Sequence, residues 1–219
     1  CINLTTVSIL GSNCTIDENA FEGCTSLTSL TLPPANNTDI SKSAFEGCSN
    51  LQSVAVGALV GVNAFKGCTN LATLNLTNSE SLNIENTAFI GCHINLIITS
   101  QKDSANYYIN DEGVYIKDND NHHIELLLGT KSFSWPIVRD NSTESEDPEQ
   151  ALRSIRVIGK NAFNGRGVSG PVNIQSGITK IDDYAFSHCT DLTSITIPDS
   201  VTSIGNYAFN NCTGIKDVY

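Results

Sequence analysis

One group in the sequence consists of histidine and aspartate, which are residue types that bind metal ions. His122 and His123 follow Asp118 and Asp120, and imidazole and carboxylate groups are common metal ligands. A calcium loop also needs a glycine at its sixth position and a glutamate at its twelfth, but the twelfth position here is Gly129. We therefore expect a hydrated turn at this place and predict no metal site.

A glycine-rich stretch has the spelling of a dinucleotide-binding loop. Gly165, Gly167 and Gly170 fit the pattern Gly-x-Gly-x-x-Gly, which binds a pyrophosphate when a strand precedes it and a helix follows it. Here the stretch follows Phe163 and precedes an expected strand at Val172–Ile174, which is the reverse context. We interpret the glycines as a variant turn and predict no cofactor.

No group of residues in the sequence predicts catalysis. His188 and Cys189 are adjacent, but the side chains of neighbouring residues diverge, so the two do not form a nucleophile and its base. The motifs Gly-x-Ser-x-Gly and His-Glu-x-x-His and the phosphate-binding loop do not occur in the sequence. We therefore expect that the chain is not an enzyme.

The phenylalanines reveal a repeat of about 23 residues. Seven of the eight follow an alanine, and the successive gaps between these seven are 24, 20, 24, 74, 23 and 23 residues. An aliphatic residue lies five positions before each, and a cysteine lies three positions after six of them, with Arg166 as the exception. The seven are Phe21, Phe45, Phe65, Phe89, Phe163, Phe186 and Phe209. One unit cannot bury its own apolar row, so the units must stack around a shared core.

Each unit combines a strand pattern with a turn pattern. The segment Cys24–Leu32 has the form Cys-x-x-Leu-x-x-Leu-x-Leu, and its last part alternates with period two, as a half-buried strand does. The segments Asp17–Phe21 and Ser41–Phe45 each look like one helical turn that begins with polar residues. We expect one short strand and one helical turn per unit.

This arrangement resembles the BspA-like branch of the leucine-rich repeat proteins. The segment Ala185–Phe209, AFSHCTDLTSITIPDSVTSIGNYAF, follows the pattern of that branch almost position for position. The resemblance implies a right-handed leucine-rich repeat solenoid of the α/β type. A parallel β-sheet would line its concave face, and short helical turns and loops would form its convex face.

The spacing divides the chain into three segments of one leucine-rich repeat domain, residues 1–219. We expect regular repeats at 1–98, a degenerate repeat at 99–152 and regular repeats at 153–219. Both ends cut a unit at nearly the same phase without a polar capping unit, so we expect the chain to be part of a longer array.

The degenerate segment contains an expected hairpin and an acidic run. Two strands at Gly113–Lys117 and His122–Leu128, joined by Asp118–Asn121, predict an inserted β-hairpin. Ser134–Pro136 resembles the strand end of a regular unit. The run Asp140–Gln150 has no apolar side chain, and we interpret it as an exposed loop rather than a ligand-binding or calcium-binding loop.

The eight cysteines follow the repeat rather than a disulfide framework. All but Cys14 share one register after the buried phenylalanine, where a cysteine behaves as a small apolar residue. We predict mostly free, buried thiols. Cys1 has the position of the lipid-bearing residue of a lipoprotein, but the repeat register already explains it.

The residues between the buried aliphatic positions of each strand should face outward on the concave sheet. They are small, hydroxylated and uncharged, which suits broad contact with a protein or glycan and suits catalysis poorly. The candidate concave binding face consists of Thr6, Ser8, Ser29, Thr31, Ser53, Thr73, Asn75, Asn173, Ser194 and Thr196. The same residue types also form ordinary solvent-facing strands, so this face could equally be soluble scaffold.

Composition narrows the partners. The net charge of −11 opposes binding to nucleic acid and to anionic lipid. No apolar run in the sequence is long enough to span a membrane. The resemblance implies a monomeric, cell-surface or secreted module that binds or adheres to host or matrix proteins or glycans. The alternatives are a structural spacer, an intracellular interaction scaffold, which free thiols would suit, or the targeting arm of an enzyme.

Overall fold

The described residues of the computed structural model belong to two compact units. Unit 1 comprises Cys1–Ser104 and Ile109–Glu112, and unit 2 comprises Ala105–Tyr108 and Gly113–Tyr219. The structure describes residues 1–11, 14–33, 38–76, 82–99, 107–109, 113–117, 123–129 and 155–219. The expected hairpin tip, the Ser134–Pro136 strand end and the acidic run Asp140–Gln150 lie outside these residues.

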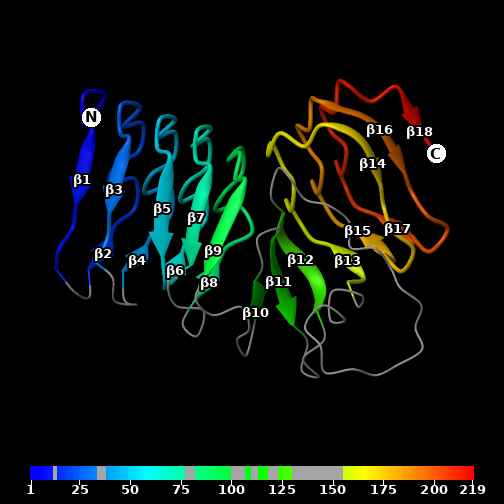
Figure 1. The fold of residues 1–219 in the computed structure, drawn as a ribbon, viewed down its shortest axis with the longest axis horizontal. Coiled ribbons are helices and arrows are strands. Elements are labelled where there is room, and N and C mark those ends of the chain that lie inside the picture. The colour runs from blue at the N-terminus through cyan, green and yellow to red at the C-terminus, as the bar shows by residue number, and fades with distance from the viewer. Residues whose placement is uncertain are drawn as a thin grey trace. The chain divides into compact units, whose positions relative to one another are not determined.

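Unit 1 is a stack of turns in which each repeat contributes a longer strand and a two-residue strand. All of the paired strands are parallel and in register (Figure 1). The longer strands are β1 (Thr6–Ser8), β3 (Ser29–Thr31), β5 (Ser53–Val56), β7 (Thr73–Leu76) and β9 (Leu96–Thr99), which pair as β1-β3 and β5-β7-β9. The short strands β2 (Thr15–Ile16), β4 (Asp39–Ile40), β6 (Leu59–Val60) and β8 (Asn83–Ile84) form one sheet in chain order.

Unit 2 repeats this arrangement and adds the hairpin. Its longer strands β14 (Gly170–Asn173), β16 (Leu192–Thr196) and β18 (Asp217–Val218) form one parallel sheet. The other sheet has the order β10-β11-β12-β13-β15-β17, with β10 (Tyr107–Ile109), β11 (Gly113–Lys117), β12 (His123–Gly129), β13 (Val157–Ile158), β15 (Lys180–Ile181) and β17 (Ser203–Ile204). The antiparallel pair β11-β12 confirms the predicted hairpin, and β12 then pairs in parallel with β13.

The segment before each phenylalanine forms turns, and no helix occurs in the described ranges of the chain. In six repeats the residue two positions before the phenylalanine has a positive φ between 54° and 61°. These residues are Asn19, Ser43, Asn63, Asn161, Tyr184 and Tyr207. A left-handed residue at this place ends any right-handed helical turn, so the repeat continues as hydrogen-bonded turns where a helical turn was expected.

The alanine–phenylalanine pairs form the core of both units. In five repeats the Phe N–H donates to the alanine carbonyl of the following repeat at 2.8 Å, as in Phe65 to Ala88 and Phe163 to Ala185. The phenyl rings of successive repeats therefore stack, with centroids 5.0 to 5.4 Å apart. The side chains of Phe45, Phe65, Phe89, Phe163 and Phe186 are fully buried. Aromatic pairs of this kind add about 0.5–1.5 kcal/mol beyond burial of their area.

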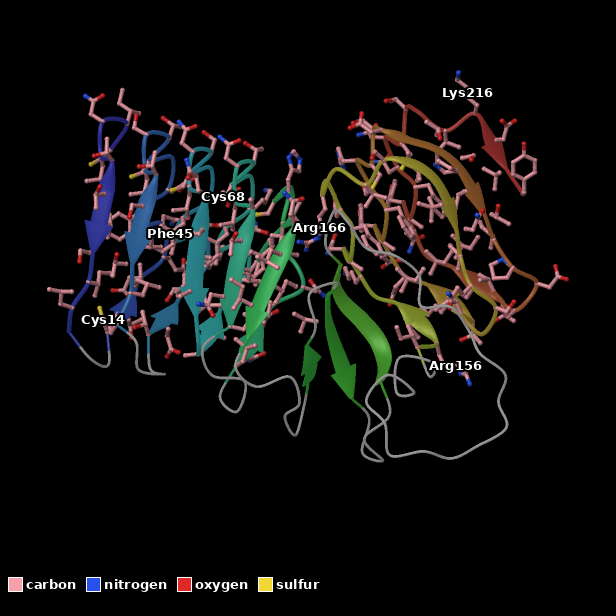
Figure 2. The ribbon with its side chains drawn as sticks, in the orientation of Figure 1. Cys14, Phe45, Cys68, Arg156, Arg166 and Lys216 are labelled. Carbon is pink, nitrogen blue, oxygen red and sulfur yellow. The ribbon has the colours of Figure 1, made fainter. Side chains whose placement is uncertain are left out.

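A row of thiols runs beside the phenyl rings (Figure 2). Five of the thiols donate to the phenylalanine carbonyl of the preceding repeat, for example Cys68 to Phe45 at 3.2 Å and Cys212 to Phe186 at 3.0 Å. All eight cysteines are free, and Cys24, Cys48, Cys68, Cys92 and Cys189 are buried, as the sequence predicts.

Arg166 occupies the one repeat position where the cysteine is missing (Figure 2). Its backbone N–H donates to the Phe163 carbonyl at 3.1 Å, which is the bond that the cysteine N–H makes in the other repeats. Only 1% of its surface is exposed, so a long cationic side chain is buried at the position where the other repeats have a thiol.

Buried thiols should not react with a thiol reagent until the protein unfolds, because the reactive species is an exposed thiolate. We expect titration of the unreduced native chain to leave the five buried thiols unmodified, whereas all eight react in guanidinium chloride. Fewer than eight reactive thiols in the unfolded, unreduced chain would instead show disulfide bonds.

The thiol row should also make the fold sensitive to alkali. Burial raises the pKa of the Cys48 thiol from 9.0 to about 11. The folded state therefore keeps this proton to a higher pH than the unfolded state does, and stability falls as pH rises from 9.0 towards 11. In urea unfolding at about pH 8 and about pH 10, we expect Cys48→Ala to lose less stability than the wild type over that interval. An equal loss in both proteins would rule out this origin.

Candidate binding surface

The outward rows of unit 1 lie where the sequence places them. Thr6 lies opposite Ser29, and Ser8 lies opposite Thr31, because β1 and β3 pair in parallel without a shift. Ser53 lies opposite Thr73 on β5 and β7. The first five of these residues are exposed, and Thr73 is half-buried, as are Ala55 and Asn75 in the next outward row.

The matching rows of unit 2 are shorter. Asn173 of β14 is exposed and lies opposite Thr196 of β16. Ser194 is half-buried and lies between Pro171 on β14 and Asp217 on β18. The structure thus divides the ten predicted residues between the sheets of two units, and within each sheet it aligns them into parallel rows.

The sequence prediction missed two features of these rows. In β9, Leu96 and Ile98 lie opposite Thr73 and Asn75, and their side chains are 44% and 45% exposed. The spacing after Cys92 is one residue shorter than in the other repeats, and a slip of one residue exchanges the two faces of a strand. That spacing was the signal available in the sequence.

The second missed feature is a charge on the outward row of unit 2. Asp217 is exposed and lies opposite Ser194, so the row contains a titratable group that the sequence analysis did not assign to it. Cys212, Ile215 and Val218 keep the regular spacing of the repeat, so the outward position of Asp217 could have been predicted from the sequence. The rows therefore combine hydroxyl and amide groups with apolar residues and, in unit 2, one carboxylate. The apolar residues are Ala55, Leu96 and Ile98 in unit 1 and Pro171 in unit 2.

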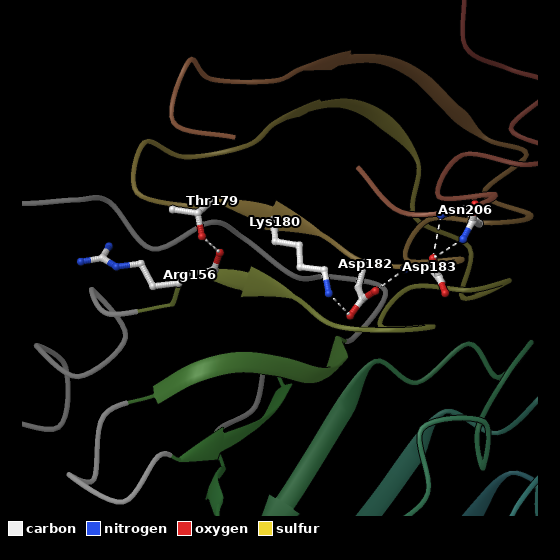
Figure 3. Close-up of polar contacts among 6 residues, drawn as sticks. All are labelled: Arg156, Thr179, Lys180, Asp182, Asp183 and Asn206. Carbon is white, nitrogen blue, oxygen red and sulfur yellow. Dashed lines mark hydrogen bonds and ion pairs between the residues drawn. The ribbon is translucent and has the colours of Figure 1, made fainter. Parts of the chain in front are cut away.

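A second polar surface of unit 2 lies along the short strands β13, β15 and β17 (Figure 3). The Thr179 hydroxyl donates to the Arg156 carbonyl at 3.1 Å. Lys180 Nζ contacts Asp182 Oδ2 at 3.0 Å, while Asp182 Oδ1 accepts the Asp183 N–H at 2.8 Å. Although burial opposes it, the hydrogen bonds from Asp183 and Lys180 and the charge of Lys180 hold the pKa of Asp182 below its usual value.

Asp183 connects two successive repeats on this surface (Figure 3). Its Oδ1 accepts the backbone N–H of Asn206 at 2.7 Å and the Asn206 side-chain amide at 3.3 Å. A carboxylate that accepts a backbone N–H makes a strong, charge-assisted bond. Asp183 therefore fixes the turn of the following repeat in place of a backbone acceptor.

Two tyrosines occupy the left-handed position directly after Asp183 and Asn206. Tyr184 and Tyr207 both have φ of 57°, and their rings stack with centroids 5.2 Å apart. A positive φ in a bulky residue costs roughly 1–3 kcal/mol, and an aromatic pair returns only about 0.5–1.5 kcal/mol. The same position in unit 1 has Asn19 and Asn63, which tolerate this conformation better, and Ser43.

The remaining candidate groups show no reactive geometry among the described residues. His188 contacts the Ser187 hydroxyl at 2.8 Å through Nδ1 and the Asn211 amide at 3.0 Å through Nε2, whereas Cys189 donates to the Phe163 carbonyl. The two adjacent residues therefore do not form a catalytic pair.

The glycine-rich stretch is a turn, as the sequence predicts. Gly165, Gly167 and Gly170 have φ of 65°, 71° and 77°, and β14 begins at the last of them. Within the described part of the chain, no three histidine, cysteine or acidic side chains are grouped to hold a metal ion. Asp118, Asp120 and His122 lie outside that part. In the same part of the chain, no helix is long and apolar enough to cross a bilayer.

Removing the Asp183 carboxylate should loosen the turn at Asn206. We expect Asp183→Ala to lower the free energy of unfolding by about 1 kcal/mol, because the Asn206 N–H loses its acceptor. Asp183→Asn keeps an oxygen at that place and should cost less. Urea denaturation measures both, with the exposed Asp199→Ala as control. Losses of equal size in all three variants would contradict this role.

Comparison with known proteins identifies the repeats. The chain matches the BspA-type leucine-rich repeat region, in six copies, over residues 1–112 and 150–219. Over its whole length it is similar to a leucine-rich cell surface protein of Faecalibacterium prausnitzii A2-165, with 21% identity and a TM-score of 0.49, and it covers 73% of that chain. It is similar over its whole length to a leucine-rich repeat protein of Bacteroides ovatus ATCC 8483, with 22% identity and a TM-score of 0.52, and covers 55% of that chain.

Among curated proteins, no match to the chain is found. At 22% identity the similarity to the Bacteroides ovatus structure concerns the fold alone, whereas the family match covers most of the sequence and includes every repeat of the described residues. On this evidence the chain belongs to the family of proteins with BspA-type leucine-rich repeats.

Proposed function

We propose that this chain is a non-enzymatic protein-binding and adhesion module of a cell-surface or secreted protein. Its outward rows on the longer strands would contact host or matrix proteins or glycans. One observation carries the proposal: the exposed side chains of β1, β3 and β5 form parallel rows of hydroxyl groups without a charge. Membership of the BspA-type family supports a recognition role, because stacked repeats provide an extended binding surface.

The chemistry of these rows favours broad contact over a single deep site. Strand spacing places successive hydroxyl groups about 4.8 Å apart, so a flat partner can make many weak hydrogen bonds at once. The apolar residues Leu96 and Ile98, at the end of the unit 1 rows, would strengthen this contact because binding removes their apolar surface from water. In this proposal the sheet is the concave face of a right-handed solenoid, 1–219 is one domain of a longer array, and the module acts as a monomer.

The free thiols favour a second candidate function, an intracellular interaction scaffold. The structure pairs none of the eight cysteines in a disulfide, and free thiols persist most readily in a reducing compartment. Burial of five of them protects these thiols outside the cell as well, which is why we place the surface module first. Protease treatment of intact source cells distinguishes the two, because the protease removes the chain only if the chain is exposed at the cell surface.

Charge on the hydroxyl rows should weaken binding without unfolding the chain. Thr31→Lys with Thr196→Lys places one lysine on the outward rows of each unit. Measured by surface plasmon resonance on an immobilised basement-membrane protein preparation, we expect the affinity to fall at least about tenfold. The cause is the cost of burying an unpaired ammonium group.

A matched control places the same charges away from these rows. Thr69→Lys with Thr190→Lys changes exposed threonines that follow the cysteines of each unit. This control should keep wild-type affinity, and both pairs should keep the wild-type thermal midpoint. Binding that the first pair leaves unchanged would move the contact to the convex side or the acidic insertion, and a wild-type chain that binds nothing would contradict the proposal.

A further inference from the structure

Two thiols of unit 1 interact with each other inside the thiol row. Cys68 and Cys92 belong to successive repeats, both are fully buried, and their side chains interact directly. Cys68 also donates to the Phe45 carbonyl at 3.2 Å (Figure 2). Cys92 donates in the same way to the Phe65 carbonyl at 3.0 Å. The row thus brings two thiols of neighbouring turns together in one interior.

The backbone holds these two cysteines at the spacing of neighbouring turns. Directly before them, the Gly67 N–H donates to the Ile90 carbonyl at 2.8 Å. A Cβ placed on Gly91 would lie 3.7 Å from the Gly67 Cα. Stacked turns are about 4.8 Å apart, and a disulfide joins Cα atoms that are roughly 4.4–6.8 Å apart. Cys68 and Cys92 are therefore at a distance that a disulfide can bridge.

Loss of both thiol hydrogens would leave no phenylalanine carbonyl without a donor. The Phe45 carbonyl also accepts the Cys48 N–H at 3.1 Å. The Phe65 carbonyl also accepts the Cys68 N–H at 3.1 Å. A buried acceptor is costly only when it has no partner at all, and both carbonyls keep a backbone donor. The interior can therefore exchange two thiols for one disulfide without losing a backbone hydrogen bond.

We propose that Cys68 and Cys92 are a latent disulfide site, which a small disulfide such as oxidised glutathione converts into a bridge between two turns of unit 1. One cysteine thiolate attacks a sulfur of oxidised glutathione, releases one glutathione thiolate and leaves a mixed disulfide on the protein. The second cysteine thiolate attacks the protein sulfur of that mixed disulfide and releases the other glutathione. The two cysteines lose two electrons, the reagent gains two, and both thiol protons pass to the glutathione thiolates. This site does not depend on the function proposed for the outward rows.

The folded interior protects this pair until unit 1 opens. The interaction with Cys92 and burial raise the pKa of Cys68 above its ordinary value, so the thiolate that attacks a disulfide is scarce in the folded state. Oxidation therefore begins when the turns open locally, and reclosing brings the mixed disulfide and the second cysteine together. The bridge then limits the freedom of the opened chain, which makes further opening rarer.

The test incubates the full chain with oxidised glutathione in urea below the unfolding transition and then blocks the remaining thiols with iodoacetamide. Trypsin and a glutamate-specific protease separate the two cysteines, because Glu80 and Glu85 lie between them, and cleavage at Lys66 separates Cys48 from Cys68. In mass spectrometry without reduction, we expect a disulfide-linked pair of peptides that contain Cys68 and Cys92. The absence of this pair, or a bridge from Cys48 to Cys68 in its place, would overturn the proposal.

A serine variant tests whether the stack selects the partner. Cys68→Ser keeps a donor for the Phe45 carbonyl and leaves Cys48 and Cys92 two turns apart, at about 9.6 Å, which is too far for a disulfide. We expect Cys92 to form no bridge within the chain in this variant. Cys14→Ser changes the cysteine outside the row and should form the bridge as the wild type does. A bridge from Cys92 to Cys48 in the Cys68→Ser protein would contradict selection by the stack.

The bridge should stabilise the turns that it joins. Urea unfolding followed by circular dichroism compares each protein after oxidation and after reduction. Oxidation should raise the urea midpoint of the wild type by at least about 1 M more than that of Cys68→Ser. Cys92→Ser, which keeps a donor for the Phe65 carbonyl, gives the same comparison if Cys68→Ser does not fold. An equal or smaller rise in the wild type would overturn the proposal, because the bridge would then not fit the stack.

Discussion

The structure depends on one backbone hydrogen bond that recurs between successive turns, from the phenylalanine N–H to the alanine carbonyl of the next repeat. It measures 2.8 Å at Phe21, Phe45, Phe65, Phe163 and Phe186. Because its length is constant, this bond fixes the spacing of the turns. The phenyl rings then stack, the thiols donate to the carbonyls of the preceding repeat, and the strands of unit 1 pair without a shift. The rows on the surface are a consequence of this internal spacing.

The sequence predicts well whatever every repeat shares. The phenylalanine, the aliphatic residue five positions earlier and the cysteine three positions later are buried as expected in the interior repeats, because the same core recurs. The hairpin was also predictable from two alternating segments around a polar turn. The turn conformation was harder to predict, since the left-handed positions hold asparagine, serine and tyrosine and share no single residue type.

The parts of the candidate surface that escaped prediction are local departures from the repeat. A one-residue shortening after Cys92 turns Leu96 and Ile98 outward, and nothing in the composition of β9 marks the slip. The contacts of Asp183 with the next repeat depend on stacking across 23 residues, so they appear only when the turns are aligned. Departures of this kind are where function most often conflicts with the simplest sequence for a fold.

Hydrogen exchange at the phenylalanine amides tests most directly whether this bond holds the repeats together. In the native chain, the N–H groups of Phe65 and Phe186 should be among the slowest to exchange, with opening free energies close to that of global unfolding. The exposed amide of Thr69 should exchange much faster. Rapid exchange at Phe65 and Phe186 in a folded protein would contradict a structure built on this interaction.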